Sequence, residues 1–226
     1  SRDIEMMKGG YEDSFYMQLI KNVRAYKGTP SESKAFSKSI DISGGLKQWE
    51  DVTNVYRAIG TASYGRNSTD CAGQSKYVME APRNNLQEIR VTHDQENIYF
   101  YIRAEKEITG SGANWMNIFI GTGSPSLKGW EGYEYVLNRS GSENSADIVK
   151  LNADFTGEIV GQADMKIDGN RMFLCVPRSL VGMQNETEFY FKAADSVATP
   201  EDIMEYYVSG SVMPMGRLSY EYKMAD

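Results

Sequence analysis

The stretch IVGQADMKIDGNRMFLCV, residues 159–176, decides the fold class of this chain. Apolar residues recur at every second position in both halves of the stretch, as half-buried strands require. Between the two halves stands Asp168-Gly169, a pair that strongly favours a tight hairpin turn. The stretch therefore predicts two antiparallel strands joined by a short turn.

The same alternation extends along most of the chain. Residues 98–104 place apolar side chains on one face, and the polar run 94–97 before them is a weaker turn signal. About ten to twelve candidate strands follow one another at the spacing of sandwiches and jelly rolls, with few helical patterns between them. We therefore expect an all-β fold, a jelly-roll-like sandwich of two antiparallel sheets.

The N-terminal region has a helical period instead. Residues 11–27 carry an apolar stripe at steps of three and four, Asp13 or Ser14 can cap its start, and Gly28 can close its end. A polar segment follows to residue 39. The predicted organisation is one N-terminal helix with a linker at 1–38 and a sandwich domain at 39–226. The helix stripe needs a surface to cover it, either the sandwich or an upstream domain of the same protein.

The charge of the chain limits the classes of partner that it can bind. The formal net charge is −7, and no run of Lys or Arg occurs, so nucleic acid and anionic membranes are poor partners. No apolar run reaches the roughly 18 residues of a membrane span. Residues 1–10 lack the apolar core of a signal peptide, so we expect either a removed signal or an internal fragment. A neutral sugar is compatible with this charge.

Residue types suited to catalysis are few. His93 is the single histidine, which excludes a histidine-based zinc triad, and there is no G-x-S-x-G elbow and no phosphate-binding glycine loop. Cys71 and Cys175 are either two thiols or one long-range disulfide. Paired carboxylates of a glycosidase stay an alternative, because the chain has 31 acidic residues. We expect a non-catalytic domain.

The segment 114–139 contains the residue types of a sugar site. Trp130 lies between glycines before Tyr133, and Asn138 and Arg139 follow. A sugar offers apolar C–H faces and rings of hydroxyls, so its site needs a flat ring with amide or guanidinium groups around it. These four residues are candidate ligand-binding residues; the alternative is that Trp130 packs in the core.

Three further residues complete the candidate set. Trp115 stands on the expected strand 115–120, either as a second ring for a ligand or as a core residue. Arg83 and Asn84 lie in a polar segment before a strand, where they either donate to a ligand or satisfy turn backbone.

The order of several motifs resembles a known group of proteins. The motifs are IDISGGLKQWEDV at 40–52, RNNLQEIRVTHDQENIYFYI at 83–102, NWMNIFIGTG at 114–123, GWEGYEYVLNR at 129–139, DGNRMFLCVPRSLVG at 168–182, FYFKAADS at 189–196 and EDIMEYYVSGSVMPMGRLSYEY at 201–222. This order resembles the C-terminal sandwich of large secreted proteins of gut Bacteroidetes and related bacteria, which is similar to the family-nine carbohydrate-binding modules.

The resemblance implies a carbohydrate-binding-like module of a secreted, periplasmic or cell-surface protein, beside an upstream glycoside-related domain. Its ligand is then a glycan or oligosaccharide held against Trp130 and Trp115, with calcium as a structural ion. The chain departs from the group's pattern at Gly121, Gly123 and Ser211, where acidic residues are usual. Calcium binds through several oxygen ligands, so the absence of these three carboxylates argues against a metal or polar role at those positions. A structural domain that braces the upstream domain without binding sugar is the second hypothesis.

Overall fold

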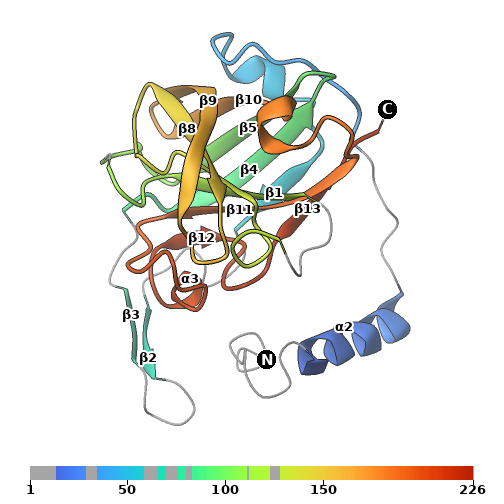
Figure 1. Cartoon of the computed structure of the whole chain (residues 1–226), viewed down its shortest axis with the longest axis vertical. Coiled ribbons are helices and arrows are strands. Elements are labelled where there is room, and N and C mark those ends of the chain that lie inside the picture. The colour runs from blue at the N-terminus through green and yellow to red at the C-terminus, as the bar shows by residue number, and fades with distance from the viewer. Residues whose placement is uncertain are drawn as a thin grey trace.

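A computed structural model shows a mostly β protein (Figure 1). The structure describes residues 14–28, 35–58, 66–69, 76–79, 83–110, 112–122 and 128–225. Its helices are α2 (Ser14–Lys27), α3 (Glu205–Val208) and the 3-10 helices η1 (Leu46–Trp49) and η3 (Arg178–Val181). Its strands are β1 (Val55–Arg57), β2 (Arg66–Thr69), β3 (Lys76–Met79), β4 (Leu86–His93), β5 (Asn97–Ala104), β6 (Asn117–Thr122), β7 (Tyr135–Leu137), β8 (Ser145–Leu151), β9 (Gly157–Asp168), β10 (Arg171–Pro177), β11 (Glu188–Asp195), β12 (Ser211–Met213) and β13 (Tyr220–Lys223).

Eleven of these strands form one antiparallel sheet. The strand order is β1-β4-β5-β10-β9-β8-β7-β6-β11-β12, with β13 also paired to β11, and β2 and β3 pair separately. The sheet curls until its two ends approach: the Tyr56 hydroxyl of β1 donates to the Glu221 carbonyl of β13 at 2.7 Å. Near the other end of this seam, the Leu86 N–H of β4 donates to Ser211 Oγ of β12 at 2.8 Å. The result is a nearly closed barrel.

The predicted antiparallel, mostly β fold is confirmed, but its division into two separate sheets is not. Ten of the eleven strands follow one continuous path of pairings, and β13 joins the same sheet through β11. Alternating strands bury one face in either architecture, so alternation alone does not distinguish a curled sheet from two packed sheets. The prediction of a single helix is not confirmed either, since α3 and the two 3-10 helices are also present.

The decisive hairpin forms as predicted. β9 and β10 pair antiparallel, with Asp168 opposite Arg171. Gly169 follows Asp168 with φ of 58°, a backbone conformation that glycine adopts without a Cβ clash. Met172, Leu174 and Val176 point into the barrel and are fully buried. Burying each such side chain contributes about 1.5–3 kcal/mol, so the interior of the barrel is the main source of stability.

Two smaller clusters pack on the outside of the sheet. Trp49 lies against Tyr101 and Phe173, with ring centroids 5.6 and 6.3 Å away, on the outer face of β5 and β10. The second, which we call the outer aromatic cluster, lies on the outer face of β6 and β7. Its rings are Phe119, Trp130, Tyr133, Phe155 and Tyr206.

Helix α2 ends where the sequence predicts. The Gly28 N–H donates to the Arg24 carbonyl at 2.8 Å, and Gly28 has φ of 81°. This is a common helix ending, because glycine reaches left-handed backbone angles without strain. The predicted start at residues 11–13 lies outside the described residues. Figure 1 shows α2 in dark blue, apart from the barrel.

Candidate functional site

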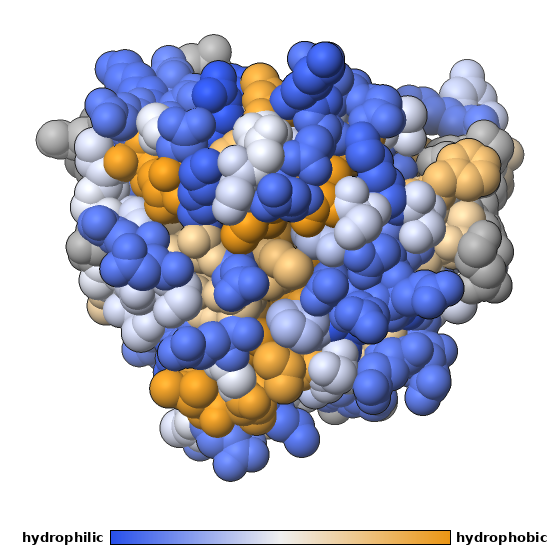
Figure 2. Space-filling model, turned by 90° about the horizontal axis from the view of Figure 1, so that it is seen from above, coloured by the Kyte–Doolittle hydropathy of each residue, from blue (hydrophilic) through white to orange (hydrophobic). Residues whose placement is uncertain are grey.

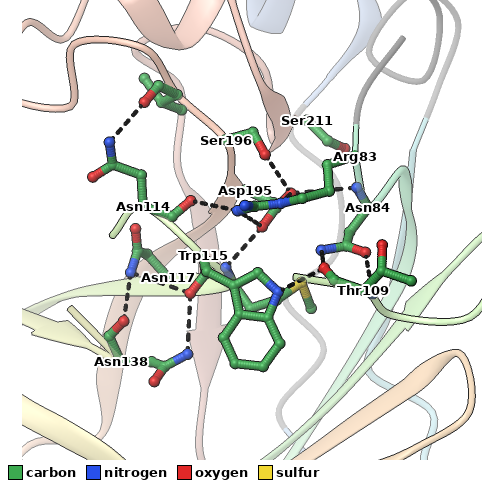
Figure 3. A network of polar contacts seen from close by, with 12 residues as sticks. Arg83, Asn84, Thr109, Asn114, Trp115, Asn117, Asn138, Asp195, Ser196 and Ser211 are labelled. Atoms are coloured by element: carbon green, nitrogen blue, oxygen red, sulfur yellow. Dashed lines mark hydrogen bonds and ion pairs between the residues drawn. The ribbon is translucent and has the colours of Figure 1, made fainter. Parts of the chain in front are cut away.

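The seven candidate residues fall into two groups. Arg83, Asn84, Trp115 and Asn138 belong to one polar network at an end of the barrel (Figure 3). The other three, Trp130, Tyr133 and Arg139, belong to the outer aromatic cluster or contact it. The sequence analysis grouped Trp130 with Asn138 and Arg139. In the fold, Trp130 lies in the outer aromatic cluster and Asn138 in the polar network.

Asp195, at the end of β11, is the centre of the polar network. Its carboxylate is fully buried and accepts five hydrogen bonds. Arg83 donates through Nη2 at 3.1 Å and Nε at 3.3 Å, and Ser196 Oγ donates at 2.8 Å. The backbone N–H groups of Met116 and Asn84 donate at 3.0 and 3.3 Å. A buried charge is stable only when it is paired and hydrogen-bonded, and this carboxylate meets both conditions.

Asn84 and Trp115 meet at the backbone of Thr109. The Asn84 side chain donates to the Thr109 carbonyl and accepts from the Thr109 N–H, both at 2.9 Å. The indole N–H of Trp115 donates to the same carbonyl at 3.0 Å. Asn84 is 2% exposed and Trp115 1% exposed. Their polar atoms therefore connect segments of the chain to one another.

Asn138 extends the network below Trp115. Its amide donates to the Trp115 carbonyl at 3.0 Å, and its own carbonyl accepts from the Asn117 amide at 2.8 Å. Asn138 has φ of 60°, a conformation that asparagine tolerates better than most residues. Its buried Oδ1 has no hydrogen-bond partner among the described residues. Asn138 thus fixes the loop after β7 against the start of β6.

Arg83 is the part of the network that reaches the surface. Its side chain is 33% exposed, in contrast to the fully buried Asp195. Gly110 lies directly against it: a Cβ at that position would stand 2.9 Å from Arg83 Cδ. The glycine therefore leaves the space in which the guanidinium lies over Asp195.

Trp130 and Tyr133 are buried in the outer aromatic cluster, at 3% and 2% exposure. Trp130 meets the edge of Phe155 at 4.7 Å between centroids, and its indole N–H donates to the Glu201 carbonyl at 3.1 Å. The Tyr133 hydroxyl pairs with Ser219 Oγ at 2.6 Å, and burial raises the pKa of Tyr133 above its ordinary value. These two rings present no open face to a ligand in this conformation.

Arg139 packs on this cluster through its guanidinium. The guanidinium carbon lies 4.7 Å from the centre of the Phe155 ring, within the range of a cation–π contact. The side chain is half-buried. Arg139 thereby covers the ring that packs against Trp130.

A half-exposed tyrosine stands elsewhere, on the outer face of β11 and β13. The Tyr190 hydroxyl donates to Glu221 Oε1 at 3.1 Å. Lys223 Nζ lies 3.6 Å from Glu221 and 3.8 Å from Glu188. Burial, and then the charge of Glu221, raise the pKa of Tyr190. This group, Tyr190, Glu188, Glu221 and Lys223, is named the β11–β13 face. Sequence reasoning did not select it.

His93 and Cys175 are the two described side chains that were considered for catalysis or a disulfide. His93 is buried, with Nδ1 2.8 Å from the Tyr222 hydroxyl and Nε2 3.2 Å from the Ala225 carbonyl. Cys175 is a free thiol whose pKa is raised to about 11 by burial and by Asp164 and Asp94. A thiol of this pKa stays protonated at neutral pH. Cys71 lies outside the described residues.

Two of the three positions at which the chain lacks the acidic residues of the resembled group lie in the described structure, and both have other roles there. Ser211 is fully buried and accepts the Leu86 N–H. At Gly121 a Cβ would stand 2.2 Å from the Gly132 carbonyl oxygen, so no larger side chain fits there. Gly123 is outside the described residues. Within the described part of the chain, no three His, Cys, Asp or Glu side chains gather as a metal site requires.

The residues that sequence reasoning missed are Asp195, Thr109 and Asn117. Thr109 acts through its backbone, which its residue type does not reveal. The signal for Asp195 was its place directly after the apolar alternation of β11, but many acidic residues end strands in this way. Only the fold shows that Arg83, 112 residues earlier, faces it.

Comparison with known proteins adds no relative. No protein-family model matches the chain, and no curated protein matches its sequence. The resemblance to family-nine carbohydrate-binding modules therefore stays a prediction. No helix among the described residues is long and apolar enough to cross a membrane.

Proposed function

We propose that this chain is a non-catalytic accessory domain, a rigid β scaffold in a larger secreted protein. One observation carries the proposal: all seven candidate residues direct their polar or aromatic groups at other parts of the chain. The rings of Trp115, Trp130 and Tyr133 are each at most 3% exposed. A sugar stacks on an exposed ring, so these three rings support packing in place of stacking.

The buried carboxylates also support a non-catalytic role. Among the described residues, the buried acids are Glu88, Asp147 and Asp195. Glu88 is paired with Arg90 at 2.8 Å, and Asp147 accepts Ser140 Oγ at 2.7 Å. A glycosidase uses two carboxylates that face each other across a substrate. Each of these three carboxylates is instead hydrogen-bonded or paired to donor groups of the chain that lie next to it in the fold.

The second candidate function is carbohydrate binding, and the β11–β13 face favours it. Tyr190 is half-exposed beside two carboxylates and an ammonium group. Such a mixture of a ring with charged hydrogen-bonding groups has the chemistry that a sugar needs. This location differs from the predicted one at Trp130.

Calorimetric titration with a panel of plant and host glycans separates the two functions. If the domain is only a scaffold, no glycan should produce heat on titration, and no glycan should change the tryptophan emission. Heat that disappears in Tyr190→Ala would establish the sugar site on the β11–β13 face and overturn the scaffold. Heat with a shift of tryptophan emission would return the site to Trp130. Glu143→Ala, at an exposed position outside both regions, is the control variant.

On the face of the barrel shown in Figure 2, apolar residues reach the surface in several patches among hydrophilic residues. Such scattered patches are usual on soluble domains. The secreted location and the upstream partner domain remain parts of the proposal that rest on the sequence resemblance alone.

A further inference from the structure

A row of charged side chains crosses the outer face of five neighbouring strands. Each of its residues stands directly opposite the next one in the antiparallel pairing. The row lies outside because the residues of opposite parity, such as Ile102 and Met172, fill the barrel. We call it the arginine row; across β1, β4, β5, β10 and β9 in turn it consists of Arg57, Glu88, Arg103, Arg171 and Asp168.

Two like charges are neighbours at the centre of this row. Arg103 on β5 stands directly opposite Arg171 on β10. The Cβ atoms of such a pair are roughly 4.5–5.5 Å apart, and like charges in this arrangement destabilise a sheet. The pair is therefore unfavourable unless a negative group neutralises it.

The carboxylate on the β4 side is already engaged. Glu88 stands opposite Arg103 and is 5% exposed. Its Oε1 accepts from Nε of Arg90 at 2.8 Å, and its Oε2 accepts from Nε of Arg57 at 3.1 Å. Both carboxylate oxygens thus serve the two other arginines, and the charge of Arg103 is left unmatched on this side.

Two further carboxylates lie near the pair without binding it. Asp168 stands opposite Arg171 at an exposed position. Glu105, two positions after Arg103, accepts the Asn85 amide at 3.0 Å. Across the residues that the structure describes, no carboxylate lies within ion-pair distance of either guanidinium of the central pair.

The central pair also contains an unsatisfied donor. Nε of Arg171 is buried and has no hydrogen-bond partner among the described residues. The rest of its side chain is half-buried, as is that of Arg103. Nearly all buried polar atoms in proteins have a partner, so an exception calls for an explanation. Positive charge and donor groups that the chain itself does not match are the chemistry of an anion site.

Aromatic rings bound one side of the pair. Tyr101 and Phe173 are two positions from Arg103 and Arg171 on the same outer face. Trp49 packs on these two rings, with centroids 5.6 and 6.3 Å away. The rings exclude water from this side, and electrostatic attraction is stronger where water is excluded. An anion here would be bound more tightly than by two arginines in open solvent.

We propose that Arg103 and Arg171 together bind a tetrahedral oxyanion, sulfate or phosphate, either as the free ion or as an ester group of a small molecule. A guanidinium presents a planar fork of donors that matches two oxygens of an oxyanion. A phosphate group offers three acceptor oxygens even as an ester, so it can accept from both forks. A carboxylate has only two. The proposal is independent of the accessory function, because it requires neither a glycan nor a partner domain.

NMR titration of the isotope-labelled full chain tests the proposal. Sodium sulfate or sodium phosphate replaces sodium chloride at constant ionic strength, so that general screening does not change. The expected result is a saturable shift of the guanidinium Nε–H signals of Arg103 and Arg171. A shift that rises linearly without saturation, or that appears equally in arginines elsewhere, overturns the site.

Arginine variants provide a matched comparison. Arg103→Gln and Arg171→Gln are each expected to raise the dissociation constant at least about tenfold. Arg103→Lys should fall between these variants and the unmodified protein, because lysine keeps the charge but loses the fork. Arg24→Gln, at an exposed position on α2, removes the same charge elsewhere and is the control. Equal affinities of the Arg24 and Arg171 variants would contradict the proposal.

The fold of these variants is checked without the anion. Each substitution in the pair removes a like-charge contact, so the melting temperature in chloride should not fall. The titration of the unmodified protein does not depend on any variant, and it decides the proposal even if one of them fails to fold.

An acidic variant gives the opposite sign. Asp168→Asn is expected to lower the dissociation constant severalfold, because it removes a negative charge that repels the anion. Asparagine before Gly169 also suits the hairpin turn. Glu143→Gln, which removes an exposed acid, is the control. A dissociation constant that rises in Asp168→Asn would place the anion away from the pair.

Esters distinguish the two sources of the oxyanion. The sulfate and phosphate monoesters of glucose are compared with the free ions and with unmodified glucose. Tighter binding of an ester supports the site and identifies an esterified ligand, whereas equal binding supports it and identifies the free ion. If unmodified glucose shifts the same signals as its esters, the oxyanion is not what is recognised, and the proposal is overturned.

Discussion

The network around Asp195 and the outer aromatic cluster use the same residue types that bind sugars, but they hold the protein together by different forces. In the network, one carboxylate is fixed by five directed hydrogen bonds. In the cluster, rings such as Trp130 are fixed by burial, with a single hydrogen bond from the indole. Loss of one partner is therefore severe in the network, whereas the cluster loses stability in proportion to the buried area removed.

Asp195→Ala is expected to have the largest effect. The substitution leaves Arg83 without its carboxylate and two buried backbone N–H groups without an acceptor. Breaking a buried ion pair from one side costs about 3–5 kcal/mol of unfolding free energy. Denaturant unfolding measures this loss, with Glu143→Ala as the exposed acidic control. A loss equal to that of the control would mean that the network contributes little.

Trp130→Phe is expected to have an intermediate effect. The phenyl ring keeps most of the packing with Phe119 and Phe155 but loses the bond to Glu201 and some volume. We expect a loss of about 1–3 kcal/mol in unfolding free energy. Thermal unfolding with the same substitution at Trp115, whose indole N–H also bonds a carbonyl, compares the two regions directly. A larger loss at Trp115 would show that the network depends on its directed bonds.

Alkaline pH is expected to weaken the cluster before the network. Burial raises the pKa of Tyr133 and of Tyr206 above the ordinary value of 10.0. A group with a raised folded pKa stabilises the protein below its unfolded pKa, and this stability is lost as the pH rises further. Unfolding free energy should therefore fall above about pH 10. In Tyr133→Phe the fall is expected to be shallower, and an unchanged pH profile would exclude Tyr133 as its source.

Removal of residues 1–28 is expected to have the smallest effect. Leu19, Val23 and Tyr26 are exposed, so their loss removes little buried area from the barrel. The melting temperature in dilute solution should remain within about a degree of the full chain, since surface changes alter stability by at most about 0.5 kcal/mol. Differential scanning calorimetry measures it. A drop of several degrees would show that α2 packs on its own barrel.

Local patterns predicted the elements better than their assembly. The β9–β10 hairpin follows from alternation and from Asp168-Gly169, and the end of α2 follows from Gly28. The single curled sheet does not follow, because it depends on long-range pairings such as β11 with β6. Burial of Trp130 depends on segment 196–206, whose Tyr206 and Glu201 cover it, and no pattern near Trp130 indicates that cover.

Some candidate residues that are close in the sequence also lie together in the fold, and others do not. Arg83 and Asn84 remain together on Asp195. Trp130 and Asn138 are eight positions apart but lie in different groups, because β7 passes from the outer cluster to the end of the barrel between them. Sequence distance is therefore an incomplete guide to which chemical groups meet.

The seam between β1 and β13 has a consequence for the order in which the chain folds. Tyr56 and Glu221 are 165 positions apart, and their hydrogen bond joins one of the first strands to the last one. Contacts between such distant positions form slowly, because a long loop must close before they add any stability. During synthesis, the barrel is unable to close until its last strand has left the ribosome. We therefore expect closure of the seam to be a late step, with the local β9–β10 hairpin formed well before it.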